Sequence, residues 1–274
     1  MIPAVDLSWA QLTAANCACL RAHGYGRIVN GLRYVSQLNQ GVADVSLENL
    51  RIAQAEGFEL EAYAYLWLGG PIEDRIARSL EACAPYPVRR LWLDFEDNGH
   101  GASGLPRDLT PDQVIELVYR GIAASDQPGA PPWGLYSAAW WWRPATANVE
   151  IWKDAPWWIA QYDGIADPTV FTPFAGITQP AMKQYQGTTQ LCDLSVDLNA
   201  AAETRVPIQD ELADLVNLLG YLQGDVAGAI RRPVASVYAM VRDTNVVNAE
   251  VRIDVLARLE AALVAVSTLE SAGK

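Results

Sequence analysis

Two acidic side chains stand two residues apart in the segment LWLDFED, residues 91–97. The alternation of residues 90–95 predicts a β-strand, and side chains at positions i and i+2 of a strand share one face. Asp94 and Glu96 are therefore expected on the same face of the carboxyl end of this strand. Residues that follow it, Asp97, Asn98 and Gly99, have the composition of a loop.

Two further acids occupy similar places in the sequence. Asp6 lies near the end of a strand predicted over residues 3–7, and Asp197 lies near the end of one predicted over residues 194–198. If the first and last strands close a barrel, these two acids project near each other. Carboxylates gathered at one mouth raise one another's pKa, so one can stay protonated near neutral pH. A protonated acid beside ionised carboxylates is what hydrolysis of a glycosidic bond requires. The alternative is that each acid caps a turn or pairs with an arginine.

Aromatic side chains near strand ends supply a second signal. Sugar rings present apolar C–H faces that stack on aromatic rings, while their hydroxyls need polar neighbours such as Gln161. The candidates are Tyr63, Tyr65, Trp67, Tyr136, Trp158 and Tyr162. The alternative for each is simple core packing. Separately, Trp140, Trp141 and Trp142 cannot all face one side, so at least one ring is expected to be exposed.

Other chemistries have little support in the sequence. There are two histidines, His23 and His100, without metal-ligand spacing, so neither a metal nor a cofactor is predicted. Both histidines are expected to be structural or solvated, although His100 lies close to the acidic pair in the sequence and could touch a substrate. The glycine pattern of residues 24–31 leads into a strand rather than following one, so it is no dinucleotide fingerprint.

The four cysteines have no CxxC spacing, and Cys17 and Cys19 are too close together for an ordinary bridge. We expect four reduced, mostly buried thiols, as in a protein made in a cytosol. The first residues show no basic segment followed by a long apolar run, so no signal peptide is predicted. No stretch is long and apolar enough to predict a membrane span.

The composition favours a globular protein. Hydrophobic residues make up 51% of the 274 residues and charged residues 19%, enough to build a sizeable core. The formal net charge of −12 argues against nucleic acid as a partner, because binding to phosphates needs a basic patch.

The elements that must position these residues alternate between strand and helix over the first half of the chain. Strands are predicted at residues 3–7, 27–32, 59–68, 90–95, 132–136, 157–162, 181–186 and 194–198, and helices at residues 9–22, 44–56, 72–84 and 110–125. Gly57 is expected to stop the second helix, and Thr110 with Pro111 to start the fourth. Eight strands in about 200 residues, with an alternation that implies a mostly parallel sheet, favour a compact barrel over an open sheet. Active sites form at the carboxyl-end rim of such barrels.

The composition changes near residue 205. Every tryptophan lies at or before Trp158, and apolar residues then repeat every three or four positions from Ile208 to Ile230. We therefore predict a catalytic barrel over residues 1–205 and a short helical appendage over residues 206–274. The appendage is expected to oligomerise the chain, dock it on another protein, recognise a wall, or pack on the barrel as a plain hairpin.

The motifs resemble glycoside hydrolase family 25, the Chalaropsis-type lysozymes common among phage endolysins. The matching segments follow the order of the family over about the first 200 residues. They are VDLSWAQ (5–11), AYAY (62–65), LWLDFE (91–96), GLYS (134–137), WWIAQY (157–162), QYQG (184–187) and VDLN (196–199). Two departures are Ala64, where the family often has histidine, and the second strand, which matches poorly.

The resemblance implies an α/β fold, a modified TIM-like (β/α) barrel with irregular last strands. It also implies a muramidase that cleaves the β-1,4 bond between N-acetylmuramic acid and N-acetylglucosamine in bacterial peptidoglycan. It implies that Glu96 is the general acid and that Asp94 orients the N-acetyl group or stabilises the cationic transition state. Asp6 and Asp197 would complete the acidic cluster, and the aromatic candidates with Gln161 would line sugar subsites. Whether the reaction retains or inverts configuration stays open.

The setting implied is a phage endolysin released by a holin, or a virion-associated lysin, made in the host cytoplasm and acting on the cell wall. In the virion setting, residues 206–274 would bind a virion partner or a second copy. Two alternatives are a non-catalytic glycan-binding or structural virion domain that kept the fold, and a hydrolase of another polysaccharide.

Overall fold

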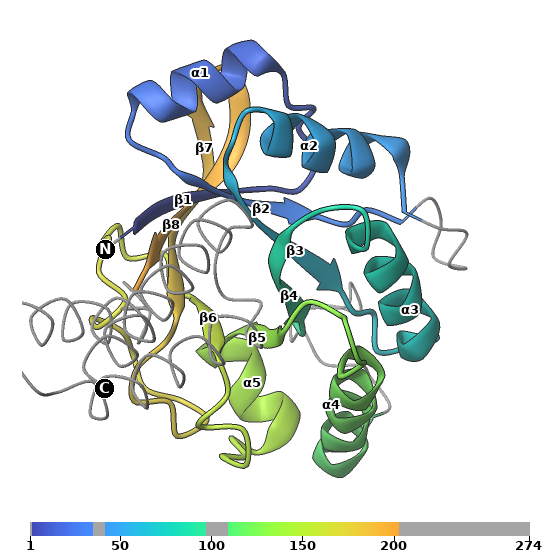
Figure 1. The fold of residues 1–274 in the computed structure, drawn as a ribbon. Helices are drawn as coiled ribbons and strands as arrows, with labels where there is room; N and C mark the ends of the chain where they lie inside the picture. Colours follow the sequence, from blue (N-terminus) through green and yellow to red (C-terminus); the bar gives the residue numbers. More distant parts are fainter. Residues whose placement is uncertain (1, 35–41, 97–108, 203–274) are drawn as a thin grey trace, which may run out of the picture. The chain divides into compact units, whose positions relative to one another are not determined.

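The computed structural model describes residues 2–34, 42–96 and 109–202 (Figure 1). The chain divides into two units, Met1–Glu203 and Thr204–Lys274, and the described residues belong to the first. The predictions for His100, for the loop after Glu96 and for the helical segment 206–274 lie outside the described residues. Within the described part, none of the helices combines the length and apolar character that crossing a membrane requires.

Eight strands of the described residues close into a barrel in chain order. They are β1 (Ile2–Leu7), β2 (Arg27–Gly31), β3 (Glu59–Tyr65), β4 (Val88–Asp94), β5 (Trp133–Ala138), β6 (Trp157–Ala160), β7 (Met182–Leu191) and β8 (Leu194–Ala201). Neighbours from β1 to β7 run parallel, whereas β8 is antiparallel to both β7 and β1. The predicted α/β barrel with irregular last strands is therefore confirmed.

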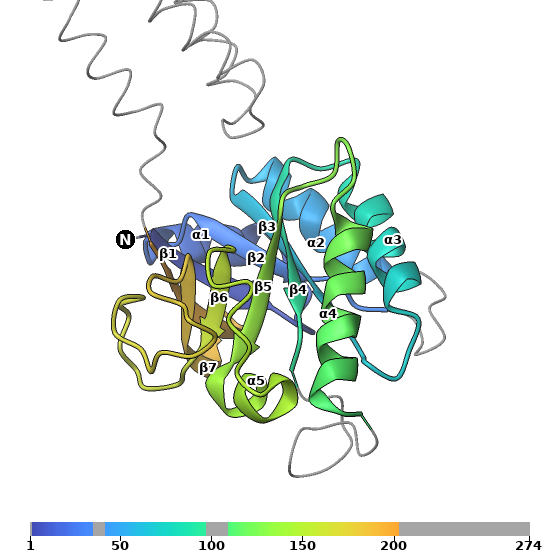
Figure 2. The same cartoon turned by 90° about the horizontal axis from the view of Figure 1, so that it is seen from below.

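Helices cover the outside of the first five strands (Figures 1 and 2). They are α1 (Ala14–Ala22), α2 (Asp44–Ala55), α3 (Ile72–Cys83), α4 (Pro111–Ser125) and α5 (Ala139–Thr146). Helix α4 begins as predicted, because Thr110 and Gln113 form a capping box. The Thr110 hydroxyl accepts from the Gln113 backbone N–H, and the Thr110 backbone N–H donates to the Gln113 side-chain oxygen at 2.8 Å. Gly57, at φ 73°, follows α2 in the left-handed region that a stop residue needs.

Two helix predictions need correction. The first helix begins at Ala14 rather than at residue 9, because the Thr13 side chain caps it by accepting from the Asn16 backbone at 3.2 Å. Helix α5 was not predicted, since Pro144 and three tryptophans are poor helix signals. It buries Trp141 and Trp142 and leaves Trp140 57% exposed, which confirms that one of these rings faces solvent.

Large rings fill the barrel interior. Trp92, Tyr136, Trp158 and Met182 are buried together inside it, with the Tyr136 and Trp158 ring centroids 4.4 Å apart. Gly134 makes room for this packing, because a Cβ there would stand 2.5 Å from the Trp92 ring. The interior is therefore a packed core rather than a pore, and the mouth of the barrel lies at one end of this core.

The last two strands form a hairpin, which explains why Asp197 is at the site. Strand β8 is longer than predicted, and Asp197 lies in its middle rather than near its end. The tight turn at Cys192 and Asp193 has φ values of 54° and 60°, as a two-residue hairpin turn requires. Because β8 runs antiparallel, Asp197 pairs directly with Asp6 of β1.

The expectation of four reduced thiols was wrong for two of the cysteines. Cys19 of α1 and Cys192 of the β7–β8 turn form a disulfide across 173 positions of sequence, while Cys17 and Cys83 are free and buried. The spacing in the sequence argued only against a bridge between Cys17 and Cys19. It gave no sign of the long-range bridge between Cys19 and Cys192. The bridge joins the first helix to the last hairpin, so it links the beginning and the end of the chain segment that forms the barrel.

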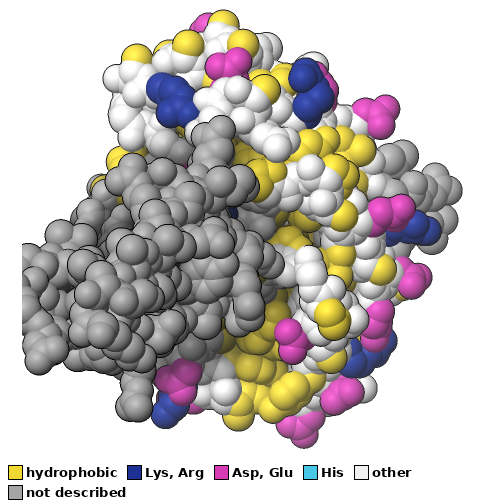
Figure 3. Space-filling view, viewed as in Figure 1, with side chains coloured by type: hydrophobic (Ala, Val, Ile, Leu, Met, Phe, Trp, Pro, Cys, Tyr) yellow, Lys and Arg dark blue, Asp and Glu magenta, His cyan; other side chains and the backbone are white. Residues whose placement is uncertain are grey.

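The surface is mixed in character. On the face shown in Figure 3, charged side chains of both signs are scattered over the described part, between patches of hydrophobic ones.

Candidate active site

The mouth of the barrel gathers the predicted acids through strand register. Asp6 and Asp197 face each other across β1 and β8. The Asp6 Oδ2 atom accepts hydrogen bonds from the side-chain amides of Gln184 at 2.9 Å and Asn199 at 2.8 Å. Asp197 accepts from the same Gln184 amide at 3.0 Å and from the Thr188 backbone N–H. The two carboxyls therefore share one amide donor.

Asp94 is the last residue of β4 and is buried at the same mouth. Its Oδ1 atom is buried and has no hydrogen-bond partner among the described residues. Glu96 was predicted on the same strand, but the strand ends at Asp94 and Glu96 lies two residues beyond it. Its side chain is half-buried. Its charge nevertheless acts on Asp94, Asp6 and Tyr136, which places it in the cluster.

The three aspartates of this cluster hold protons more tightly than ordinary carboxyls. Burial, and then the Asp197 carboxylate, raise the pKa of Asp6 from 3.8 to about 8. Burial, and then the Glu96 and Asp6 carboxylates, raise the pKa of Asp94 well above its usual value. Burial raises the pKa of Asp197 too, against the hydrogen bond from Thr188. The predicted direction is right, but desolvation contributes more than the mutual repulsion on which the prediction rested.

Gln184 organises the cluster, although sequence reasoning did not single it out. Its Oε1 atom accepts from the hydroxyls of Tyr136 and Tyr162, each at 2.8 Å, while its amide bonds Asp6 and Asp197. One glutamine thus connects two predicted tyrosines with two predicted acids. Its place at the start of the quoted QYQG segment was the available signal.

Asn199 was likewise missed. It donates to Asp6 and accepts from the Trp158 indole N–H at 2.8 Å. Amide side chains do not stand out in a sequence as acids do, so the quoted VDLN segment was the sole signal.

The tyrosines of β3 form another side of the mouth. The Tyr63 hydroxyl donates to Ser8 Oγ at 2.8 Å, and its ring lies over Gly31, where a Cβ would come within 2.7 Å of it. Tyr65, half-buried, pairs in register with Asp94. Trp67 follows the strand, and its ring lies against the backbone of Gly69, within 2.9 Å of where a Cβ would be.

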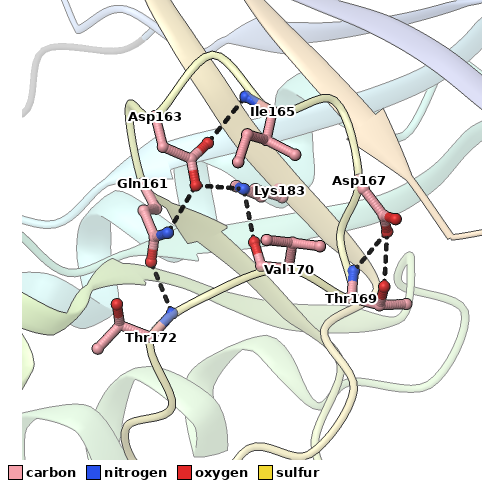
Figure 4. Close-up of polar contacts among 8 residues, drawn as sticks. All are labelled: Gln161, Asp163, Ile165, Asp167, Thr169, Val170, Thr172 and Lys183. Carbon is pink, nitrogen blue, oxygen red and sulfur yellow. Dashed lines mark hydrogen bonds and ion pairs between the residues drawn. The ribbon is translucent and has the colours of Figure 1, made fainter.

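Two predicted sugar-binding residues have other places in the structure. Trp158 is only 1% exposed, because β6 turns its ring into the barrel interior beneath Tyr136. Gln161 uses both ends of its side chain inside the following loop: its amide donates to Asp163 at 2.7 Å, and its carbonyl accepts from the Thr172 N–H at 2.7 Å (Figure 4). Both side chains bond other residues of the protein, and a part for the half-buried Gln161 in sugar binding stays a prediction.

A cavity of about 390 Å³ opens beside the acids, within the size range of small-ligand sites. Asp197 forms part of its wall. The other lining residues are Tyr162, Gly164, Tyr185, Gln186, Gly187 and Thr188. Tyr162 is 61% exposed here, so a sugar ring could reach its face.

Trp9 is a further aromatic residue at this end of the barrel that the list of sugar-binding candidates did not include. It follows β1, is 70% exposed, and stacks under the Arg33 guanidinium at 4.0 Å from the ring centroid. The resemblance segment VDLSWAQ contained it, but a single exposed tryptophan has no distinctive spacing.

The described residues contain one group of metal-type side chains, Cys19, His23 and Cys192. Both of its sulfurs are bonded to each other in the disulfide. Those two sulfurs are therefore not free thiolate ligands. Among the described residues, the acidic cluster at the barrel mouth offers carboxyl groups for acid–base chemistry.

Comparison with known proteins gives a consistent result. A model of the family described as Lysozyme-like protein 1 matches residues 1–185. A relative from Dictyostelium discoideum named Probable GH family 25 lysozyme 5 is 29% identical over 156 residues, 56% of this chain and 69% of that protein.

Two solved structures share the fold. A muramidase from Trichobolus zukalii superposes with a TM-score of 0.61 at 13% identity, covering 76% of this chain and 97% of the other. A bacterial lysozyme from Streptomyces coelicolor gives 0.58 at 18% identity, covering 75% and 94%. At these identities the superpositions establish the barrel fold.

Proposed function

This chain belongs to glycoside hydrolase family 25, and we propose that it is an N-acetylmuramidase, a lysozyme. Its substrate would be bacterial peptidoglycan, and its reaction hydrolysis of the β-1,4 bond between N-acetylmuramic acid and N-acetylglucosamine. The observation that carries this proposal is the gathering of Asp6, Asp94 and Asp197 at one barrel mouth, within reach of the Glu96 charge.

In this proposal Glu96 gives its proton to the glycosidic oxygen. Burial and the neighbouring Glu96 charge raise the pKa of Asp94, which favours a proton on Asp94 before substrate binds. A sugar acetamido N–H donating to the unbonded Asp94 Oδ1 would favour the ionised form of Asp94. The proton would then pass to Glu96, which is only half-buried and so stays accessible to the leaving oxygen. Asp94 would be left to orient the acetamido group.

The aromatic cleft supports a glycan as substrate. Tyr162 offers an exposed ring face, and Tyr63 stands across the mouth beside the acids. Beneath these rings, the side-chain amides of Gln184 and Asn199, which bond Asp6, would supply polar partners for sugar hydroxyls.

The test is digestion of a panel of purified bacterial walls, with mass spectrometry of the products. New reducing ends on N-acetylmuramic acid are expected. Reducing ends on N-acetylglucosamine would instead identify a glucosaminidase. Binding to walls without any new reducing end would favour the non-catalytic glycan-binding alternative.

We also propose that the protein works outside a reducing cytosol, on the cell wall, as a holin-released endolysin or a virion-associated lysin after synthesis in the host cytoplasm. The Cys19–Cys192 disulfide supports an oxidising place of action, because such bonds persist there and are rare in the cytosol. Blocking holin function in producing cells would delay lysis if the endolysin setting holds. Lysis on the same schedule would contradict it.

A further inference from the structure

Tyr162 depends on an irregular loop for its position. The segment from residue 161 to 181 joins β6 to β7 with no helix. The Tyr162 hydroxyl bonds Gln184, yet the ring is mostly exposed. A loop lacks the hydrogen-bond ladder of a helix, so other bonds must fix the backbone that carries this ring.

Lys183 supplies such bonds from beneath the loop. Its neighbours on β7, Met182 and Gln184, face the barrel interior and the acids, so Lys183 faces outward. The loop covers it completely, leaving its side chain 0% exposed. Its ammonium donates to Asp163 Oδ2 at 2.8 Å and to the Val170 carbonyl at 2.6 Å (Figure 4). The lysine thus joins the beginning of the loop to its middle.

Asp163 extends this connection along the loop. Its Oδ1 atom accepts from the Ile165 N–H at 2.9 Å, and its Oδ2 atom accepts from the Gln161 amide as well as from Lys183. Gln161 in turn holds the Thr172 N–H. Tyr162 sits between Gln161 and Asp163, so the residues on both sides of it are fixed by the same network.

Burying a lysine is costly unless it is paired, and an apolar side chain of similar length would fill the same space without that cost. The ion pair is therefore a poor device for stability alone, but a good one for selecting a single loop conformation. We propose that Lys183, through Asp163 and Val170, is a positioning residue that holds Tyr162 against the acids as a wall of the sugar-binding cleft. This inference rests on the proposed function.

The first experiment replaces Lys183 by methionine in the full-length chain and measures turnover of soluble peptidoglycan fragments. The folded variant is expected to show a KM raised about tenfold, with kcat within about twofold, because Lys183 faces away from the barrel interior and the acids lie on or beside β1, β4 and β8. Lys183→Arg, which keeps the charge and the donors, should recover part of the loss. Lys153→Met, at an exposed lysine of the turn before β6, is the matched control and should leave KM unchanged.

A double-mutant cycle with Tyr162→Ala shows whether Lys183 acts through that ring. If it does, Lys183→Met with Tyr162→Ala should raise KM no further than Tyr162→Ala alone. Additive effects, or a Lys183→Met variant that melts earlier but keeps the KM of the unchanged chain, would overturn the proposal. Should Lys183→Met not fold, Asp163→Asn carries the same test with the same outcomes.

Failure of the proposed function is separable from failure of this inference. If the unchanged chain releases no reducing ends, the muramidase proposal fails. Binding of N-acetylglucosamine tetramer, followed by tryptophan fluorescence, then tests the loop alone. About tenfold weaker binding by Lys183→Met supports the positioning role, whereas equal binding contradicts it.

Discussion

At the scale of single residues, Asp6 shows how burial prepares a carboxyl for the site. Its side chain is almost without water, and two amides bond one of its oxygens. With a pKa of about 8, the folded chain keeps a proton on Asp6 in the window from about pH 4 to 8, where the unfolded chain has lost it. The stability that Asp6 contributes is therefore greatest below pH 4 and declines as the pH rises towards 8.

Asp6→Asn should flatten this dependence. The variant cannot titrate at this position, so its free energy of unfolding should fall less steeply with pH, by up to about 1.4 kcal/mol per pH unit. Denaturant unfolding of both chains between about pH 5 and 8 measures the two slopes. Parallel curves would mean that Asp6 is ionised in the folded state throughout this window.

Gln184→Met tests the residue that joins the acids to the tyrosines. The change keeps the size of the side chain but removes four hydrogen bonds. We expect kcat to fall by about ten- to a hundredfold, because the acids lose their fixed orientation. Gln190→Met, at an exposed glutamine of the same strand, is the control. Equal kcat in both variants would show that Gln184 does not order the site.

At this scale the sequence predicted which acids assemble but not what holds them. Acids at strand ends are visible from strand periodicity, so Asp94 and Asp6 were found. Gln184 and Asn199 were missed, since an amide has no distinguishing pattern until its partners are known. Trp158 was misjudged because periodicity says which residues share a face and not whether that face lies inside a barrel.

At the scale of elements, the β7–β8 hairpin was the hardest part to predict. Its turn places Cys192 and Asp193 at positive φ, where glycine or asparagine is the usual signal. Without that signal, two separate strands were predicted and the antiparallel direction of β8 was missed. By contrast, α4 was predicted with its start, because a capping threonine followed by proline acts locally and is not overridden by packing.

The Cys19–Cys192 bridge should stabilise this arrangement strongly. Closing a loop across 173 positions contributes up to about 5 kcal/mol by the entropic estimate, and about 2–4 kcal/mol is typical of measured bridges. Cys192→Ser is expected to lower the free energy of unfolding by about 2–4 kcal/mol. Reductant should destabilise the unchanged chain and have no effect on the double variant Cys19→Ser, Cys192→Ser. A chain indifferent to reductant would contradict the bridge.

At the scale of the whole molecule, the barrel closes before the second unit begins. Residues Ile2 to Asp6 of β1 pair with β8 from Ala201 back to Asp197, so every strand has two neighbours. The number of strands and the barrel were predicted from eight apolar runs in about 200 residues, although helical patterns alternate with these runs only over the first half of the chain. The boundary near residue 205 came from a change in composition, and the helices predicted beyond it stay a prediction.

A chain ending at residue 205 is therefore expected to fold alone. Its melting temperature should lie within a few degrees of the transition of the barrel in the full chain, with equal kcat on soluble fragments. Scanning calorimetry and the fragment assay measure both quantities. Aggregation of the shortened chain would show that residues 206–274 belong to the core, and sedimentation of both chains would report any role in oligomerisation.

The central claim is that Glu96 gives a proton to the glycosidic bond in this acidic cluster. The most direct measurement is the rate at which Glu96→Gln releases reducing ends from purified peptidoglycan, beside Glu81→Gln, which changes an exposed glutamate of α3. We predict a loss of at least about a hundredfold for Glu96→Gln, because an amide cannot donate the proton, and no loss for the control. A Glu96→Gln variant that works at the unchanged rate would contradict the assignment.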